Sequence, residues 1–339
     1  MNPSNSYHRS TPSSDQDKNN CANITPSHRG IKLDTSGIET EMRRDYLHDN
    51  LVIIAPNRGK RPYDTKDFGH TLIETAKSPR LDENTFVSEL KNKNGNWIVK
   101  VVENKFPSLT LNNPRAYGKQ EVVIDTPRSN VSFGALSPHQ IREVLEVYIQ
   151  RTKSLLHQNG IKYVLVFKND GYEAGASLAH AHSQIFAMPI IPQKYQHESD
   201  LVEEYFKETN KNPFDDIIDF EKNQHSRVVS ENKQWFVFCP YASQWPFELW
   251  FLPKRHFVNS IELDSSELES LSELLKKYLS KLHSNGISFN MYLQNGVSDN
   301  HRFGIKVCGR SNIWGGLEVS TGIVINTVPP ESATKWYKS

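Results

Sequence analysis

Apolar side chains recur at the spacing of one helix face in two long segments of the chain. The first predicted helix begins behind the capping sequence Ser137 to Gln140 and ends at Asn159-Gly160. The second begins behind Asp264 and ends at Asn285-Gly286, again followed by isoleucine. The two helices therefore share their start and stop signals, which indicates an internal repeat.

Short apolar runs typical of strands lie before and after each predicted helix. Each half of the chain therefore reads β, β, long helix, β, β. Because the single helix lies between hairpins and does not alternate with every strand, the pattern predicts an α+β fold with a largely antiparallel sheet. The clearest runs are residues 97–101, 121–124 and 163–167 in the first half, and 235–238, 247–252 and 289–293 in the second.

Composition and pattern divide the chain at residues 40, 192 and 230. Residues 1–40 are rich in Ser, Asn, Asp and Thr without apolar periodicity, and we interpret them as a disordered tail. Residues 41–192 and 231–339 hold the two halves of the repeat, and the polar segment 193–230 connects them. A predicted strand at 51–54 leads into a cationic loop that contains Arg58 and Arg61.

The overall charge of the chain carries no functional signal. Forty basic and 39 acidic side chains leave a formal net charge of +1, so we expect neither nucleic acid nor a membrane as a partner. Cys21, Cys239 and Cys308 form no CxxC pair, and the chain shows neither a spanning apolar run nor a signal peptide. These features predict a cytoplasmic protein, in which a local site must bind any anionic ligand.

The candidate chemistry is concentrated in the stretch from Gly171 to Gln184. In a strand, His180, His182 and Gln184 alternate onto one face, behind a loop whose glycines let backbone N–H groups approach a phosphate. A neutral imidazole can attack phosphorus, and an amide can donate to a phosphoryl oxygen. His-x-His spacing also suits zinc, but a zinc site would need further ligands from elsewhere.

The stretch from Gly175 to Gln184 resembles the active-site strand of the galactose-1-phosphate uridylyltransferase family, the transferase branch of the histidine-triad superfamily. The resemblance extends over about residues 43 to 335 and implies a duplicated histidine-triad-like fold, in agreement with the repeat. The residues that carry it, in the family's order, are Arg58 to Pro62, Glu103 to Pro107, Phe167 to Asn169, Gly175 to Gln184, Trp245 to Glu248, Leu252 to His256, Gly316 to Glu318 and Val328 to Glu331.

The resemblance assigns a role to each candidate residue. His182 would be the nucleophile that takes a nucleoside monophosphate from a nucleotide sugar, with Gln184 and Ser177 holding the phosphoryl oxygens. Asn104 would lie beside the nucleoside, and Glu318 would bind sugar hydroxyls. The residues expected to contact or surround the substrate are Arg58, Arg61, Asn104, Asn169, Gly175, His180 and Glu318.

The chain departs from the family where other members bind metal. The stretch from Tyr63 to His70 lacks the cysteine pair of zinc-binding members, so we expect no metal and no cofactor. His180 is then expected to support the His182 strand instead of binding zinc. Other family ligand positions fall at Ser129, Arg302 and Gly304, with Lys306 where an acid often stands, while His180 and His256 remain.

The resemblance implies a transferase of carbohydrate and galactose metabolism that acts as a homodimer. It would move UMP between UDP-glucose and a hexose 1-phosphate through a nucleotidyl-His182 intermediate. One alternative is a nucleotide-sugar or dinucleotide phosphorylase that uses inorganic phosphate as acceptor, since Val324 stands where uridylyltransferases often place a polar sugar contact. Another alternative is a nucleotide-binding relic without activity, although a pure binder would not require His182 with Gln184.

Overall fold

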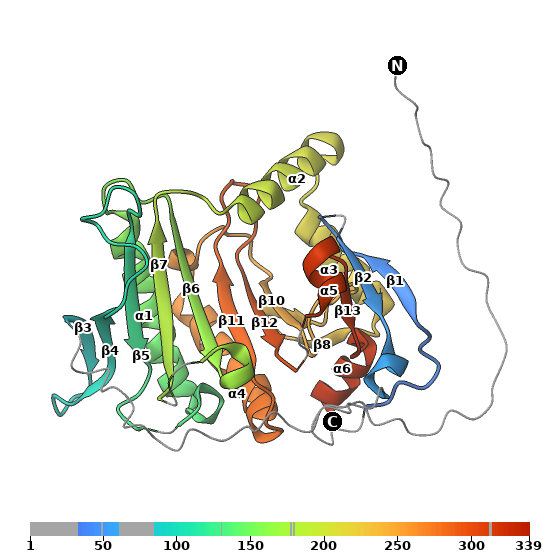
Figure 1. Ribbon diagram of the computed structural model, residues 1–339, viewed down its shortest axis with the longest axis horizontal. Coiled ribbons are helices and arrows are strands. Elements are labelled where there is room, and N and C mark those ends of the chain that lie inside the picture. The colour runs from blue at the N-terminus through green and yellow to red at the C-terminus, as the bar shows by residue number, and fades with distance from the viewer. Residues whose placement is uncertain are drawn as a thin grey trace.

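One ten-stranded sheet forms the centre of the protein (Figure 1). The computed structural model describes residues 33–48, 50–60, 85–129, 131–176, 178, 180–311 and 314–339. The strand order is β3-β4-β5-β7-β6-β11-β12-β10-β9-β8, and every neighbouring pair is antiparallel. The strands are β3 (Phe86–Lys91), β4 (Trp97–Glu103), β5 (Lys119–Ile124), β6 (Tyr163–Asp170), β7 (His182–Met188), β8 (Val228–Glu231), β9 (Trp235–Phe238), β10 (Leu249–Pro253), β11 (Phe289–Gln294) and β12 (Gly304–Gly309).

The strand order is symmetric about the central β6–β11 pair. From the edge of the sheet to its centre, the first half has the order β3-β4-β5-β7-β6, and the second half has the matching order β8-β9-β10-β12-β11. The sheet therefore confirms the predicted duplication and the α+β class. The expected pattern is one strand short in each half, because β3 and β8 were not predicted. Both are edge strands whose polar residues, such as Ser88 and Glu89, hide the strand pattern.

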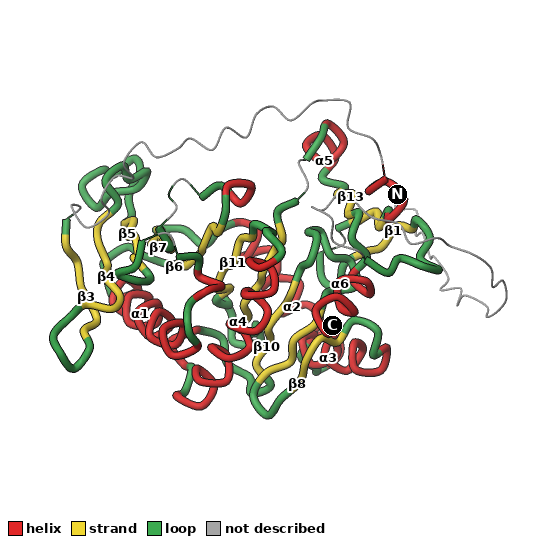
Figure 2. Tube along the Cα trace, turned by 90° about the horizontal axis from the view of Figure 1, so that it is seen from below, coloured by secondary structure: helices red, strands yellow, loops and turns green. Residues whose placement is uncertain are grey.

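The two long helices cover one face of this sheet. Helices α1 (Pro138–Leu156) and α4 (Ser265–Ser284) pack side by side, as Figure 2 shows. Their apolar stripes, which include Val144, Tyr148 and Leu275, form the main core with inward residues of the strands, such as Ile185 and Ile305. The start signals are confirmed, since Ser137 and Asp264 accept hydrogen bonds from backbone N–H groups of the first turns.

The other face of the sheet is covered unequally. Over the second half, α2 (Gln193–Thr209) and α3 (Pro213–Gln224) form a second core on Phe236 and Phe238. These two helices lie within the segment that we predicted to connect the halves. Over the first half, residues such as Phe167 and Phe186 are only half-buried on that face, with ring centroids 5.6 Å apart. The first half therefore keeps an accessible sheet face.

A small second sheet lies beside the second half of the chain. It has the order β1-β2-β13, from Glu41–Arg44, Leu51–Ile54 and Val324–Asn326. Helices α5 (Gly316–Thr321) and α6 (Pro330–Lys338) flank β13 in the chain. The predicted strand at 51–54 is confirmed as β2, and the cationic loop begins as a 3₁₀ turn at Pro56–Lys60.

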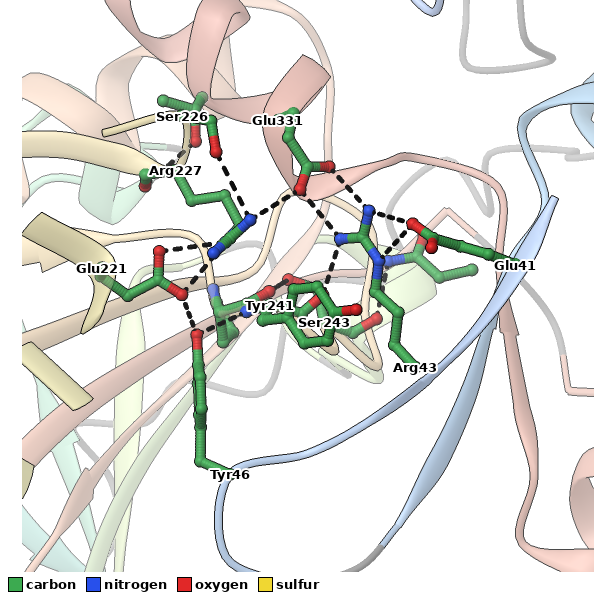
Figure 3. Close-up of polar contacts among 12 residues, drawn as sticks. Glu41, Arg43, Tyr46, Glu221, Ser226, Arg227, Tyr241, Ser243 and Glu331 are labelled. Carbon is green, nitrogen blue, oxygen red and sulfur yellow. Dashed lines mark hydrogen bonds and ion pairs between the residues drawn. The ribbon is translucent and has the colours of Figure 1, made fainter. Parts of the chain in front are cut away.

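A network of charged side chains fastens this small sheet to the second half (Figure 3). Arg43 of β1 and Arg227, just before β8, both donate to Glu331 Oε1, over 2.9 and 3.0 Å. Arg227 also donates to Glu221 of α3, which accepts from the hydroxyl of Tyr46. Because these groups are largely withdrawn from water and hydrogen-bonded to one another, they fix the position of β1 against α3 and α6.

Ordered contacts begin earlier in the chain than predicted. Leu33 is buried in the main core, and Asp34 Oδ2 accepts from Lys335 Nζ at 2.6 Å. The expected tail is therefore wrong for residues 33–40, because a single apolar residue and a charge pair with α6 hold that segment without any periodic pattern. Among the described residues, none of the helices has the length and apolar character needed to span a bilayer.

Candidate active site

His182 is the first residue of β7, between β5 and β6 on the accessible face of the first half. Its side chain is 7% exposed, and its Nδ1 lies 2.8 Å from the His180 carbonyl oxygen. Since a carbonyl can only accept, Nδ1 carries the proton and Nε2 keeps its lone pair. Burial lowers the pKa of His182, and the nearby Lys168 ammonium adds to that shift. The imidazole is thus held as a neutral base or nucleophile.

A buried ion pair lies directly behind His182. Lys168 of β6 donates to Asp125 Oδ2 over 2.6 Å and to the His182 carbonyl oxygen over 2.7 Å. Both charged side chains are at most 1% exposed. The ammonium is therefore tied both to the carboxylate and to the backbone of the candidate nucleophile, which fixes where β7 begins.

Ser183 extends this support to helix α1. Its hydroxyl donates to Asp125 over 3.2 Å and makes a close hydrogen bond with the Tyr148 hydroxyl. Tyr148 projects from α1 into the core and is fully buried. Ser183 is thus held on the face of the sheet that the helices α1 and α4 cover, while His182 points to the opposite, accessible face.

The glycine loop before β7 is held by the second half of the chain. Gly171 has φ +90°, and a Cβ there would lie 2.3 Å from Ser288 Oγ, so a side chain does not fit. Asn290 of β11 donates to Asn169 Oδ1 over 2.7 Å and to the Ala174 carbonyl over 2.8 Å. The two halves therefore build the loop together, with Gly175 in the left-handed region at φ +81°.

Gln184 and Asn169 face the same side of the sheet as His182. Gln184 lies two residues along β7, opposite Val122 and Phe167, and its amide makes no hydrogen bond with any residue that the structure describes. The β6–β7 register, extended by two residues, places Asn169 opposite His182. An oxygen-rich substrate at His182 would thus find two amides in reach.

His180 differs from its expected place. It precedes β7, and its Nε2 donates to the Thr126 carbonyl oxygen over 2.6 Å. The prediction that strand alternation aligns His180 with His182 is therefore wrong, because the strand begins only at His182. The expected support role agrees with this bond, which joins the segment before β7 to the one after β5.

Other predicted site residues lie farther away or outside the described residues. Asn104 follows β4, two strands from β7 and roughly 13 Å along the strand direction from the row of His182. Its side chain accepts from the Phe106 N–H over 2.9 Å. Ser177 and Arg61 lie outside the described residues, so their phosphate-binding roles stay predictions.

The structure does not bring Arg58 and Glu318 to His182 within one chain. Arg58 is exposed in the turn after β2, and Glu318 lies in α5 and accepts from the Gly315 N–H over 2.9 Å. Both belong to the small-sheet region, which Figures 1 and 2 place at the far end of the molecule from β5 and β7.

Sequence reasoning missed Asp125, Lys168 and Asn290 as parts of the site. Lys168 lies within the family motif Phe167 to Asn169, but a lysine in a predicted strand gives no sign that it is buried. Asn290 lies in the second half, at a position that the repeat could have indicated, since it pairs with Asn169 in the central strand pair.

Among the described residues, no group of three His, Cys, Asp or Glu side chains could hold a metal ion. His70, Asp64 and Asp67 lie outside the described residues, so metal independence stays a prediction. We expect protein purified without added metal to contain far less than one zinc or iron per chain, and a strong chelator to leave its melting temperature unchanged. Near-stoichiometric zinc, together with a large chelator-induced drop, would contradict this and direct attention to those three residues.

The comparisons with known proteins agree with this geometry. The chain matches the galactose-1-phosphate uridyl transferase N-terminal domain over residues 62–192 and the C-terminal domain of the same family over residues 193–305. The chain belongs to this family. It is a nucleotidyltransferase, and its duplicated fold is that of the family.

The relatives of this family member include an ADP-glucose phosphorylase and galactose-1-phosphate uridylyltransferases. An ADP-glucose phosphorylase from Arabidopsis thaliana is 29% identical over 335 residues, which cover 87% of this chain and 91% of that protein. A crystal structure of an ADP-glucose phosphorylase from the same plant with bound ADP-glucose has a TM-score of 0.76 at 26% identity, and covers 89% of this chain and 99% of that one. A galactose-1-phosphate uridylyltransferase from Streptomyces lividans is 34% identical over 187 residues, 55% of this chain and 51% of that protein.

Proposed function

We propose that the protein transfers a nucleoside monophosphate from a nucleotide sugar through a covalent nucleotidyl-His182 intermediate. The observation that carries this proposal is the buried His182 imidazole, whose Nδ1 proton is committed to the His180 carbonyl so that Nε2 is available for attack. Nε2 attacks the α-phosphorus, an N–P bond forms, and the P–O bond to the sugar phosphate breaks. The acceptor's phosphate oxygen then attacks the same phosphorus, and the N–P bond breaks.

The first reaction we propose moves UMP between UDP-glucose and a hexose 1-phosphate. It is the reaction that the family resemblance implies, and the site residues His182, Gln184 and Asn169 suit a phosphoryl group in either half-reaction.

The cytoplasm is the compartment that we propose for this reaction. Cys239 and Cys308 are buried free thiols, which supports a reducing compartment.

A second candidate is a nucleotide-sugar phosphorylase, in which inorganic phosphate accepts the nucleotidyl group. It is favoured by the ADP-glucose phosphorylase relative, which matches nearly the whole chain, whereas the uridylyltransferase from Streptomyces lividans matches about half. Incubation with UDP-glucose or ADP-glucose, each with galactose 1-phosphate or inorganic phosphate, separates the two. If products form only when inorganic phosphate is the acceptor, the protein is a nucleotide-sugar phosphorylase and the uridylyltransferase reaction is rejected.

We expect Gln184→Ala to slow transfer by about 10²-fold, because the amide would donate to the phosphoryl oxygens as charge builds up on them. Steady-state rates with saturating nucleotide sugar measure this effect. Gln196→Ala on the exposed surface of α2 is the matched control and should leave the rate unchanged. Equal rates for Gln184→Ala and Gln196→Ala would show that Gln184 does not stabilise the transition state.

We further propose that Arg58 and Glu318 act in the site of a partner subunit in a homodimer. They lie far from the His182 of their own chain, and α5 displays Leu317 and Val319, the latter 75% exposed, next to Glu318. An exposed apolar helix beside site residues is typical of a subunit contact, and the open sheet face at Phe167 and Phe186 offers a half-buried apolar surface for it.

Subunit complementation tests this arrangement. His182→Gly and Glu318→Ala should each be inactive alone, but co-refolded dimers should regain activity in about a quarter of the sites, since one site of each heterodimer carries neither change. Recovery would show that His182 and Glu318 of different chains share a site. The control is a chain that carries both His182→Gly and Glu318→Ala. Refolded alone, it should stay inactive. No recovery despite proven heterodimers would place the site within one chain.

A further inference from the structure

A small pocket lies away from His182, where the β1–β2 turn meets the covered face of the second half. It encloses about 40 Å³ and is lined by charged side chains that include Asp45, His48, Lys194, Glu248 and Lys306. A space of this size holds roughly three water molecules or one small ion. Neither the sequence motifs nor the proposed reaction assigns a role to it.

Lys306 of β12 is the feature of this pocket that needs an explanation. Its side chain is 7% exposed, and its Nζ lies 3.9 Å from the centroid of the Trp250 ring. The ammonium makes no hydrogen bond or ion pair with any residue in the described part of the chain. A buried ammonium without an acceptor is costly, so a group that accepts from Nζ is expected in the pocket.

The carboxylates that line the pocket are already engaged by other donors. Asp45 accepts from the Leu47 N–H at 3.0 Å and from Asn50 Nδ2 at 2.8 Å. Glu248 accepts from the Trp245 N–H at 3.1 Å and from Trp250 Nε1 at 2.7 Å. Both carboxylates therefore already have donors among the residues that line the pocket, whereas Lys306 has no acceptor among the described residues.

Among the charged side chains that line the pocket, the cations Lys194, Lys306 and His48 outnumber the carboxylates of Asp45 and Glu248. Burial opposes protonation of His48, but its interactions with Asp45 and Glu198 prevail and raise its pKa to about 9, so it is a cation at neutral pH. Burial raises the pKa of Glu248 and lowers that of Lys306, so it disfavours both charges. Glu198 is engaged by His48 at 3.2 Å and by His301 at 3.0 Å.

We propose that this pocket binds a small inorganic anion, of the size of a halide or phosphate ion, through Lys306 at its base and Lys194 at its rim. The pocket is lined by the β1–β2 turn, the start of α2, and strands β10, β11 and β12. An ion bound there would therefore tie the small sheet and α2 to the large sheet. This site is independent of the proposed reaction at His182.

Bromide tests the proposal directly, because its anomalous scattering locates it. In crystals of the full chain grown with sodium bromide, we expect an anomalous peak within hydrogen-bonding reach of Lys306 Nζ. At constant ionic strength, bromide should raise the melting temperature of the protein by roughly 2–4 °C when it reaches about ten times its Kd. The absence of a peak at Lys306 would overturn the proposal.

Variants show whether the lysines bind the ion. Lys306→Met should lose both the peak and the melting shift, and Lys194→Ala, an exposed position that folding does not need, should weaken the apparent affinity for bromide severalfold. Lys338→Met, which removes one exposed positive charge at the C-terminus, is the matched control and should keep the whole shift. If Lys306→Met fails to fold, Lys194→Ala alone decides, and an unchanged affinity there would reject the site.

Discussion

Replacing His182 with glycine should abolish transfer, with a loss of at least ~10⁴-fold in kcat, because glycine supplies no nucleophile and the neighbouring imidazole, His180, precedes β7 and is held by its Nε2 at the Thr126 carbonyl oxygen. Wild-type protein mixed with UDP-glucose or ADP-glucose and no acceptor should gain the mass of one nucleoside monophosphate. That adduct should be acid-labile, as expected for an N–P bond. Intact mass spectrometry also reports which base is transferred.

The control for this result must separate chemistry from folding. His157→Gly removes an exposed imidazole at the end of α1 and should leave both the rate and the adduct unchanged. The His182 variant should still unfold cooperatively, although at a lower melting temperature, because glycine removes a buried ring from strand β7. A His182→Gly protein that still turns over near the wild-type rate, or still forms the adduct, would assign the nucleophile to another residue.

The sequence predicted the parts of the fold that have a periodic signal. The helix faces, the caps at Ser137 and Asp264, and the duplicated order of elements all follow from spacing and local turn chemistry. Edge strands β3 and β8 do not, because their polar and apolar side chains do not alternate clearly, even though each strand pairs with the next one in the chain. Likewise, the union of both halves into one sheet depends on the β6–β11 pair, which no local pattern encodes.

The site divides in a similar way. His182, Gln184 and the glycines were found because one short stretch carries them. The support beneath them comes from three different segments, since Asp125, Tyr148 and Lys168 meet only after β5, α1 and β6 pack together. Arg58 and Glu318 were assigned to the same site by resemblance, but their separation from His182 could not be read from spacing along the chain.

The Lys168–Asp125 pair should control both stability and the pH dependence of the reaction. Lys168→Met leaves the Asp125 carboxylate buried without its cation, which should cost about 3–5 kcal/mol of unfolding free energy. Asp125→Asn should also destabilise the protein. The double variant replaces the pair with two neutral groups and should recover part of the loss, since breaking a buried pair costs more than removing it whole.

The pH profile provides the readout that a purely structural role would not change. His182 attacks as the neutral imidazole, so activity should fall as the pH drops through its pKa, which burial and then Lys168 hold below the ordinary value of 6.5. Removing the cation in Lys168→Met should raise that pKa and move the acid limb of kcat/KM to higher pH. Asp125 acts in the opposite direction, so Asp125→Asn should move the limb to lower pH. Acid limbs that stay in place in both folded variants would restrict Lys168 to holding the strand.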